Sequence, residues 1–312
     1  MTASALFRIG ARGSPLSRAQ VALLRARMAA IFEIAPERIE FLPITTSGDR
    51  IQDRSLVESG GKGLFTKELD EALLDGRIDL ALHSMKDLPA ELPASLALAA
   101  VPAREDCRDA FISKAFASFA DLPDGAVLGT ASVRRGAQAL RAKQGRLRVE
   151  LLRGNVETRL RKLDEGHVQA TFLAYAGLKR LGLEAHARAL LDPREMPPAA
   201  CQGALAVTTR ADDAQRFASL DDSRARIETS AERAFLAALD GSCRTPLGAL
   251  SKLENGKLAF LGEVLRPDGS ESWRKEETID LGADPRAAAA ALGARIGAEL
   301  RAIGVREGVF TS

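Results

Sequence analysis

The chain has 312 residues, of which 46% are hydrophobic and 28% charged, and its formal net charge is +2. This composition is typical of a globular protein with two or three domains, and a nearly neutral chain has no general attraction to nucleic acid. No stretch approaches the length of a membrane span, the first residues lack the apolar core of a signal peptide, and the three cysteines form no CxxC pair. We therefore expect a cytoplasmic protein with reduced thiols, no membrane partner and no metal site.

Strands and helices alternate through the first hundred residues, which predicts a mostly parallel sheet. Ser14 followed by Pro15 is typical of a helix N-terminus. The polar, glycine-rich stretch 47–63 shows no periodicity, so we expect a lid loop there. The other elements expected in this part are strands at 6–11, 38–46 and 78–85 and helices at 15–32 and 65–76.

The character of the sequence changes near residues 100–110, where VPAREDCRDAFIS, residues 101–113, is typical of a hinge followed by a new strand, and a second alternating unit follows. The elements expected in it are strands at 126–130, 148–152 and 170–177 and helices at 132–144, 155–166 and 176–183. The proline-containing segment 193–210 ends in an apolar strand that we expect to return to the first unit. Two such crossings are typical of two-lobed folds that close around a solute.

The last part of the chain has a different pattern, with a helix at 224–241, three strand-like runs and an alanine-rich helix at 285–303. NG at 255–256 and DG at 268–269 are hairpin signals. The predicted fold class is α/β, with two lobes like those of periplasmic binding proteins, a double hinge and a small α+β C-terminal domain. The expected domains are residues 1–104 with 199–221, residues 105–198, and residues 222–312.

The segment HSMKDLP, residues 83–89, follows a buried strand and presents polar side chains at its carboxyl end, where ligands bind in open α/β sheets. Asp87 is flanked by Lys86 and followed by Pro89. Its carboxyl group is a candidate general acid or base, or a group that stabilises a cationic intermediate. The alternative is an aspartate that caps a turn before the proline.

Arginine accounts for 34 of the 44 basic residues, and several arginines stand where a strand gives way to a helix. Helix N-termini favour anions, and a distributed set of arginines suits several separate carboxylates better than one triphosphate. No GxxxxGK[ST] or GxGxxG motif is present. The alternative for any single arginine is a solvated surface role. The positions concerned are Arg12, Thr130, Ser132, Arg134, Arg135, Arg153, Gly154 and Arg159.

Two loop segments carry candidate reactive groups. Cys243 lies in DGSCRTPLG, where Arg244 favours the thiolate, so this cysteine is a candidate for covalent attachment. The alternative is a small buried residue in a tight turn. In GGKGLF, residues 60–65, Lys62 is the charge that a closing loop would bring to a ligand, and a flexible glycine loop is the alternative.

Taken together and in order, these motifs resemble the porphobilinogen deaminase family from about residue 8 to 250. The matching segments are RIGARGSPL, GGKGLF, HSMKDLP, AREDCRDAF, GTASVRR, LRGNVETRL, LAYAGLKRLGL, QGAL and GSCRTPLG. The resemblance implies a transferase of tetrapyrrole (heme) biosynthesis that joins four porphobilinogen molecules head to tail, with release of ammonia, to give hydroxymethylbilane. Nothing in the sequence indicates an obligate partner, so we expect a monomer whose small-molecule partner is porphobilinogen.

The resemblance also implies a dipyrromethane cofactor, held through a thioether to Cys243, and a catalytic aspartate at Asp87. The cofactor-binding residues that it implies are Ser84, Lys86, Asp87, Thr130, Ser132, Arg134, Arg135, Arg153, Gly154 and Cys243. The substrate-binding residues that it implies are Arg12, Ser14, Lys62, Phe65, Arg153, Arg159, Arg180 and Gln202.

The sequence departs from the family pattern at Cys107, where we expect Pro, and at Cys201, where we expect Gly or Ala. Either change alters the stiffness of a hinge segment or adds a second reactive thiol. A smaller departure is SGD at 47–49. Two other functions stay open at this point: a non-catalytic, two-lobed protein that binds an organic anion, and another C–N lyase or transferase without a bound cofactor. Both predict an unmodified Cys243.

Overall fold

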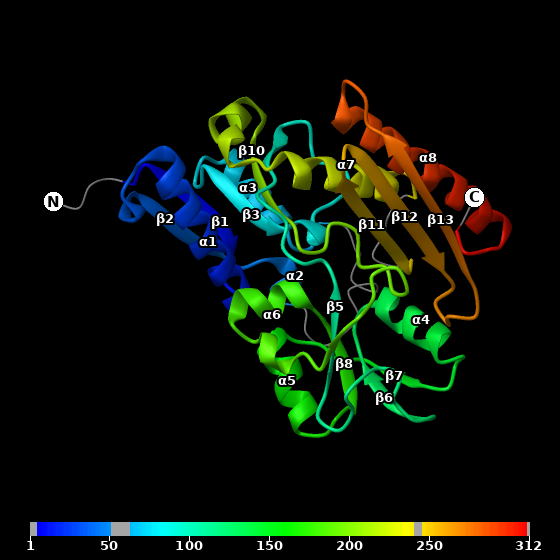
Figure 1. Cartoon of the computed structure of the whole chain (residues 1–312). Coiled ribbons are helices and arrows are strands. Elements are labelled where there is room, and N and C mark those ends of the chain that lie inside the picture. Colours follow the sequence, from blue (N-terminus) through cyan, green and yellow to red (C-terminus); the bar gives the residue numbers. More distant parts are fainter. Residues whose placement is uncertain (1–4, 51–62, 240–244, 311–312) are drawn as a thin grey trace. The chain divides into compact units, whose positions relative to one another are not determined.

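The computed structural model describes residues 5–50, 63–239 and 245–310 (Figure 1). The chain forms two compact units, of which the first is Met1–Glu105 with Ala204–Arg226 and the second is Asp106–Gly203 with Ile227–Ser312. The chain passes between the units after residues 105, 203 and 226. No helix in the described ranges is long and apolar enough to cross a membrane.

The first unit contains a five-stranded sheet in the order β2-β1-β3-β10-β4. Strands β1 (Phe7–Arg12), β2 (Ile39–Ile44) and β3 (Leu80–Ser84) are parallel neighbours. Strand β10 (Leu205–Arg210), drawn in yellow-green in Figure 1, pairs antiparallel with both β3 and β4 (Leu96–Ala100). This pairing confirms the predicted return of the segment 193–210 to the first unit.

The helices of the first unit are α1 (Pro15–Phe32), α2 (Ser47–Arg50) and α3 (Lys67–Leu74). The short turn α2 corrects the prediction that residues 47–63 form a loop throughout. It forms because Asp49 Oδ2 accepts hydrogen bonds from the amide and hydroxyl of Thr46, while the Asp49 amide donates to the Thr46 carbonyl. Residues 51–62 of the predicted lid lie outside the described residues. The 3-10 helices of this unit are η1 (Pro36–Arg38), η2 (Met85–Asp87) and η4 (Ala211–Leu220).

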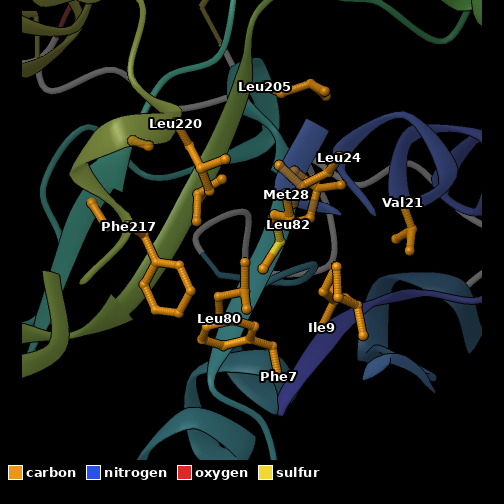
Figure 2. Close-up of a cluster of buried hydrophobic side chains, with 14 of the residues drawn as sticks. Phe7, Ile9, Val21, Leu24, Met28, Leu80, Leu82, Leu205, Phe217 and Leu220 are labelled. Carbon is orange, nitrogen blue, oxygen red and sulfur yellow. The ribbon is translucent and has the colours of Figure 1, made fainter. Parts of the chain in front are cut away.

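The core of the first unit joins both parts of its sequence, as Figure 2 shows. Leu205 from β10 and Phe217 from η4 pack with Ile9 and Leu80 in one cluster of buried side chains. The rings of Phe7 and Phe217 lie 5.5 Å apart in an edge-on arrangement. Burial of each such side chain stabilises the fold by about 1.5–3 kcal/mol, so the returning segment is an integral part of the lobe.

The second unit contains a five-stranded sheet in the order β7-β6-β8-β5-β9. Strands β6 (Val127–Gly129), β7 (Arg148–Glu150) and β8 (Ala170–Ala174) are parallel neighbours. Strand β5 (Asp109–Ser113) is antiparallel to both β8 and β9 (Ala189–Leu190). The helices between them are α4 (Val133–Ala142), α5 (Val156–Asp164), α6 (Tyr175–Leu181) and η3 (Glu184–His186).

The two five-stranded sheets share one connectivity. In each, the first parallel strand lies between the second and the third, and an antiparallel strand separates the third from an edge strand. The antiparallel strands, β10 and β5, each follow a passage of the chain between units. This common arrangement confirms the predicted α/β class with two similar lobes, although no internal repeat is visible in the sequence.

The second unit also contains a three-stranded antiparallel sheet of β11 (Leu247–Glu254), β12 (Lys257–Leu265) and β13 (Ser272–Asp280). Helix α8 (Pro285–Arg306) packs on this sheet (Figure 1), and α7 (Ser223–Ala238) contributes to the same core. A Cβ atom on Gly293 would lie 1.9 Å from the carbonyl oxygen of Ala231, so glycine lets α8 approach α7. The α+β pattern predicted for this part is confirmed; the three domain boundaries remain a prediction.

Candidate active site

The carboxyl ends of β1, β2 and β3 lie at one edge of the first sheet because these strands are parallel. Strand β3 ends at Ser84, and η2 then presents Lys86 and Asp87, both exposed. The buried side chains of Met85 and Leu88 flank them and hold the turn. HSMKDLP therefore ends a buried strand, and its acidic and basic side chains face solvent.

Two neighbours of Asp87 have structural contacts of their own. Ser84 Oγ accepts a hydrogen bond from Gln20 Nε2 at 3.0 Å, which links α1 to the end of β3. His83 Nε2 lies 3.0 Å from Thr208 Oγ1, and burial lowers the His83 pKa to about 4. A histidine with this pKa is neutral near pH 7, so His83 adds no charge next to Asp87.

Arg12, at the end of β1, has its guanidinium held from two sides. Its Nε donates to Asp49 Oδ1 at 2.9 Å, and its guanidinium carbon lies 4.3 Å from the centroid of the Phe65 ring. Burial raises the pKa of Asp49, but hydrogen bonds from Arg12 and Thr46 and the charge of Arg12 lower it overall. Ser14 next to this site accepts from the amide of Ser17 and caps α1.

In the second unit, two helices begin at the carboxyl ends of the parallel neighbours β6 and β7. Ser132 caps α4 and accepts from the Arg135 amide, while Thr130 Oγ1 accepts from the Ser132 amide. Asn155 caps α5 by accepting from the Thr158 amide at 2.8 Å. Because β6 and β7 are parallel neighbours, both helices start at one edge of this sheet.

Gly154 precedes α5 with φ +121°, and a Cβ atom on it would lie 2.5 Å from Thr158 Cγ2. Glycine is therefore required at this turn. Arg159 Nε donates to the Gly154 carbonyl at 2.8 Å. Arg153 Nη1 is buried and has no hydrogen-bond partner among the described residues.

Arg134 and Arg135 lie in the first turn of α4 and are only 4% and 5% exposed. Asp109 Oδ1 accepts from Arg135 Nη2 at 2.7 Å and from its Nε at 3.2 Å. Asp109 Oδ2 lies 2.9 Å from Arg134 Nη1. The same Arg134 nitrogen donates to Gln138 Oε1 and to the Pro197 carbonyl. One carboxylate thus contacts both guanidinium groups.

The charges in this cluster do not balance. Burial raises the pKa of Asp109, but Arg134 and Arg135 outweigh this effect and hold it far below its ordinary value. Two guanidinium groups and one ionised carboxylate leave one net positive charge. Nearby Glu263 is paired with Arg274, whose Nε lies 2.6 Å from Glu263 Oε1. A buried excess charge is costly unless an ion pairs with it, so the cluster favours an anion.

Two further predicted residues contact backbone carbonyls of the second unit. Arg180 Nη2 donates to the Gly203 carbonyl at 2.6 Å. Gln202 is fully buried, and its Nε2 donates to Asp109 Oδ1 and to the Cys107 carbonyl, both at 2.8 Å. Lys62 and Cys243 lie outside the described residues.

Two carboxylates that contact candidate arginines, Asp49 and Asp109, are absent from the sequence predictions. Asp49 stands in the SGD turn, which the sequence marked only as a departure from the family pattern. Asp109 stands in AREDCRDAF at the start of an apolar strand, where a buried carboxylate needs a cationic partner. The position of Asp109 in the sequence was therefore a sign of a buried ion pair, but the sequence does not identify the cationic partner.

The chain matches known proteins over nearly its whole length. Residues 7–218 match "Porphobilinogen deaminase, dipyromethane cofactor binding domain", and residues 226–302 match "Porphobilinogen deaminase, C-terminal domain". The porphobilinogen deaminase of Caulobacter vibrioides is 53% identical over 308 residues, which cover 95% of each chain. That of Nitrobacter hamburgensis is 52% identical, with 94% of this chain and 92% of the relative covered.

Among solved structures, the methionine-binding protein MetQ aligns with a TM-score of 0.42 at 14% identity, over 75% of this chain and 95% of MetQ. The family assignment depends instead on the two domain matches and on relatives that share about half of their residues with this sequence. The chain therefore belongs to the porphobilinogen deaminase family.

Proposed function

We propose that this transferase is a hydroxymethylbilane synthase, which joins four porphobilinogen molecules head to tail and releases one ammonia at each addition. Family membership is the observation that carries the proposal. The described site supports it with an exposed carboxylate at one sheet edge and a set of arginines at the ends of parallel strands. The substrate carries carboxylate side chains, which such arginines bind.

Asp87 is the proposed catalytic residue. Loss of ammonia from the aminomethyl group of porphobilinogen leaves an electron-poor azafulvene, which the free α-carbon of a terminal pyrrole attacks. A carboxylate beside the pyrrole N–H groups stabilises the positive charge that develops on them and accepts or returns a proton. Asp87 suits this role because it is exposed on a short turn held by buried neighbours, so substrate can reach it.

The arginines are the proposed binding groups for carboxylates. Each porphobilinogen unit adds two of these groups to the growing chain, so several separate cationic contacts are needed. Each charged hydrogen bond contributes about 1.5–3 kcal/mol. For substrate we assign Arg12, Ser14, Lys62, Phe65, Arg153, Arg159, Arg180 and Gln202.

The first family domain is a dipyrromethane-binding domain, and the described residues fit such a group. Arg134 Nε and Arg153 Nη1 are buried donors without a hydrogen-bond partner among the described residues, which suits them to ligand carboxylates. When bound, dipyrromethane supplies the pyrrole α-carbon to which the first substrate is joined. We propose that it is held through a thioether to Cys243 and contacted by Ser84, Lys86, Asp87, Thr130, Ser132, Arg134, Arg135, Arg153 and Gly154.

We also propose that the protein acts in the cytoplasm and as a monomer. A thioether can form at Cys243 only while its thiol is reduced, which favours a reducing compartment. A monomer is proposed because the assigned catalytic and binding residues all belong to one chain.

The intact mass of the denatured chain, with peptide mapping around Cys243, tests the function. The proposal requires an added mass equal to two linked pyrrole units on that residue, or its acquisition when the purified chain is incubated with porphobilinogen. A chain that stays at its polypeptide mass after this incubation would instead be a binding protein or an enzyme of another kind.

A further inference from the structure

Asp109 is a buried charged group that the proposed reaction does not use. It is the first residue of β5, and its side chain has no exposed surface. Strand β5 lies inside the second five-stranded sheet, between β8 and β9. A carboxylate in such a place is rarely retained without a partner, and its partners here are the two arginines assigned to the cofactor.

The contacts of Asp109 divide between its two oxygens. Oδ1 accepts from Arg135 Nη2 and Nε, at 2.7 and 3.2 Å, and from Gln202 Nε2 at 2.8 Å. Oδ2 lies 2.9 Å from Arg134 Nη1 as an ion pair without hydrogen-bond geometry. The carboxylate therefore fixes the separation of the two guanidinium groups, and Gln202 fixes the carboxylate.

The two arginines differ in the donors that the protein leaves unused. Arg135 donates hydrogen bonds from Nε and Nη2 to Asp109, and from Nη1 to the Phe172 carbonyl. Arg134 contacts Gln138, the Pro197 carbonyl and Asp109 through Nη1, and its buried Nε has no hydrogen-bond partner among the described residues. Arg134 thus retains a donor for a ligand, whereas Arg135 is held mainly by the protein.

We propose that Asp109 is a positioning residue for the cofactor site: it holds Arg134 and Arg135 at a defined spacing, with Gln202 as its support, so that Arg134 can donate to a cofactor carboxylate. This inference rests on the proposed function. It also reassigns Gln202 from direct contact with substrate to support of Asp109, since its amide nitrogen is already engaged inside the protein.

Positioning and simple charge balance predict opposite results for Asp109→Asn. This variant keeps the size of the side chain but removes its charge, so the net positive charge of the cluster rises. If positive charge alone governed cofactor uptake, the variant would take up the cofactor at least as fast as the unsubstituted chain. If Asp109 positions the arginines, the guanidinium groups repel each other and separate, and uptake slows.

The experiment follows uptake by full-length chain purified without cofactor. The chain is incubated with porphobilinogen, and the fraction that carries the added mass is measured over time by intact mass spectrometry. We expect Asp109→Asn to acquire the adduct at least about tenfold more slowly while its circular dichroism is unchanged, since a factor of ten corresponds to the loss of one modest charged contact. Uptake at the original rate or faster would overturn the proposal.

Gln202→Met provides a second variant in case Asp109→Asn does not fold. It removes the donor to Oδ1 without changing any charge. Slower cofactor uptake supports the positioning role. Normal uptake together with a raised KM for porphobilinogen would mean that Gln202 contacts substrate, and the proposal would then be wrong.

Asp79→Asn is the matched control. Asp79 also binds an arginine through both oxygens, because Arg8 Nε donates to Oδ2 and Nη2 to Oδ1. It precedes β3, at the end of the strand opposite to Asp87. This variant should lose stability but take up the cofactor normally.

Arg134→Gln and Arg135→Gln separate this inference from the proposed function. If both variants take up the cofactor normally, the assignment of these arginines to the cofactor fails. If both take it up slowly while Asp109→Asn is normal, that assignment stands and only the role of Asp109 is overturned.

Discussion

The guanidinium of Arg12 lies over the ring of Phe65 and donates to the carboxylate of Asp49. Both side chains of the ion pair are about one-quarter exposed, and Asp49 also binds Thr46. The arginine assigned to substrate is therefore held in place before any ligand arrives. Such preorganisation reduces the entropy lost on binding.

Asp49→Asn should lower the free energy of unfolding at neutral pH by about 1 kcal/mol, a value reduced for partial exposure. The pKa of Asp49 is lowered in the folded protein, so its contribution is present above the unfolded pKa and is lost as pH falls through the folded value. Urea unfolding at about pH 7 and about pH 3 should show the difference between variant and unsubstituted chain shrinking at the lower pH. An equal difference between variant and unsubstituted chain at both pH values would contradict the prediction. Asp280→Asn is the control, because Asp280 forms an exposed ion pair with Lys257.

Asp87→Ala should leave the fold intact and stop turnover. Asp87 is exposed, so its loss should change stability by less than about 0.5 kcal/mol. Loss of a general acid–base group lowers kcat by about 100- to 10,000-fold. Steady-state product formation and thermal unfolding measure the two effects. The control is Glu91→Gln, which changes another exposed carboxylate nearby and should keep its activity. Near-normal turnover by Asp87→Ala would refute the catalytic role assigned to Asp87.

Cys243→Ser should prevent attachment of the cofactor, because a serine hydroxyl cannot form the thioether. The denatured variant should keep its polypeptide mass after incubation with porphobilinogen. Cys107→Ser, which replaces a half-buried thiol in the second unit, should acquire the adduct normally. An adduct that persists in Cys243→Ser and disappears in Cys107→Ser would move the attachment point to Cys107.

Gly154→Ala should destabilise the protein and disturb the turn that carries Arg153. The alanine would need both a positive φ and space that Thr158 occupies. We expect a loss of about 1–3 kcal/mol from backbone strain, with an added cost from the contact. Gly166→Ala is a close control, because Gly166 has φ +81° but nothing within 4 Å of a Cβ atom. Equal losses in urea unfolding would show that Thr158 gives way without cost.

Local chemistry predicted much of the framework. The sequence predicts the helix N-terminus at Ser14, and the structure confirms it, because a cap requires only a short polar side chain next to its helix. The strand that ends at HSMKDLP was recognised by its apolar run, and the return of the segment 193–210 by a strand after prolines. The long, ordered motifs also indicated the family, because their order along the chain is itself specific.

The short strands β4 and β9 illustrate what the local pattern left undecided. Strand β4 was not predicted, and β9 has only two residues whose pairing with β5 identifies it as a strand. Edge strands of this kind are defined by hydrogen bonds to a neighbour far away in the sequence, which a local window does not contain.

The sequence alone determined the helix caps, the main strands, the catalytic candidate Asp87 and the family, because each depends on residues that are adjacent or keep their order. The tertiary structure decided which carboxylate meets which arginine. Asp109 lies 26 residues from Arg135 and 93 from Gln202, and Asp49 lies 37 residues from Arg12. These partners meet only because strand order and helix packing bring them together, and the burial that makes their ion pairs strong exists only in the folded chain.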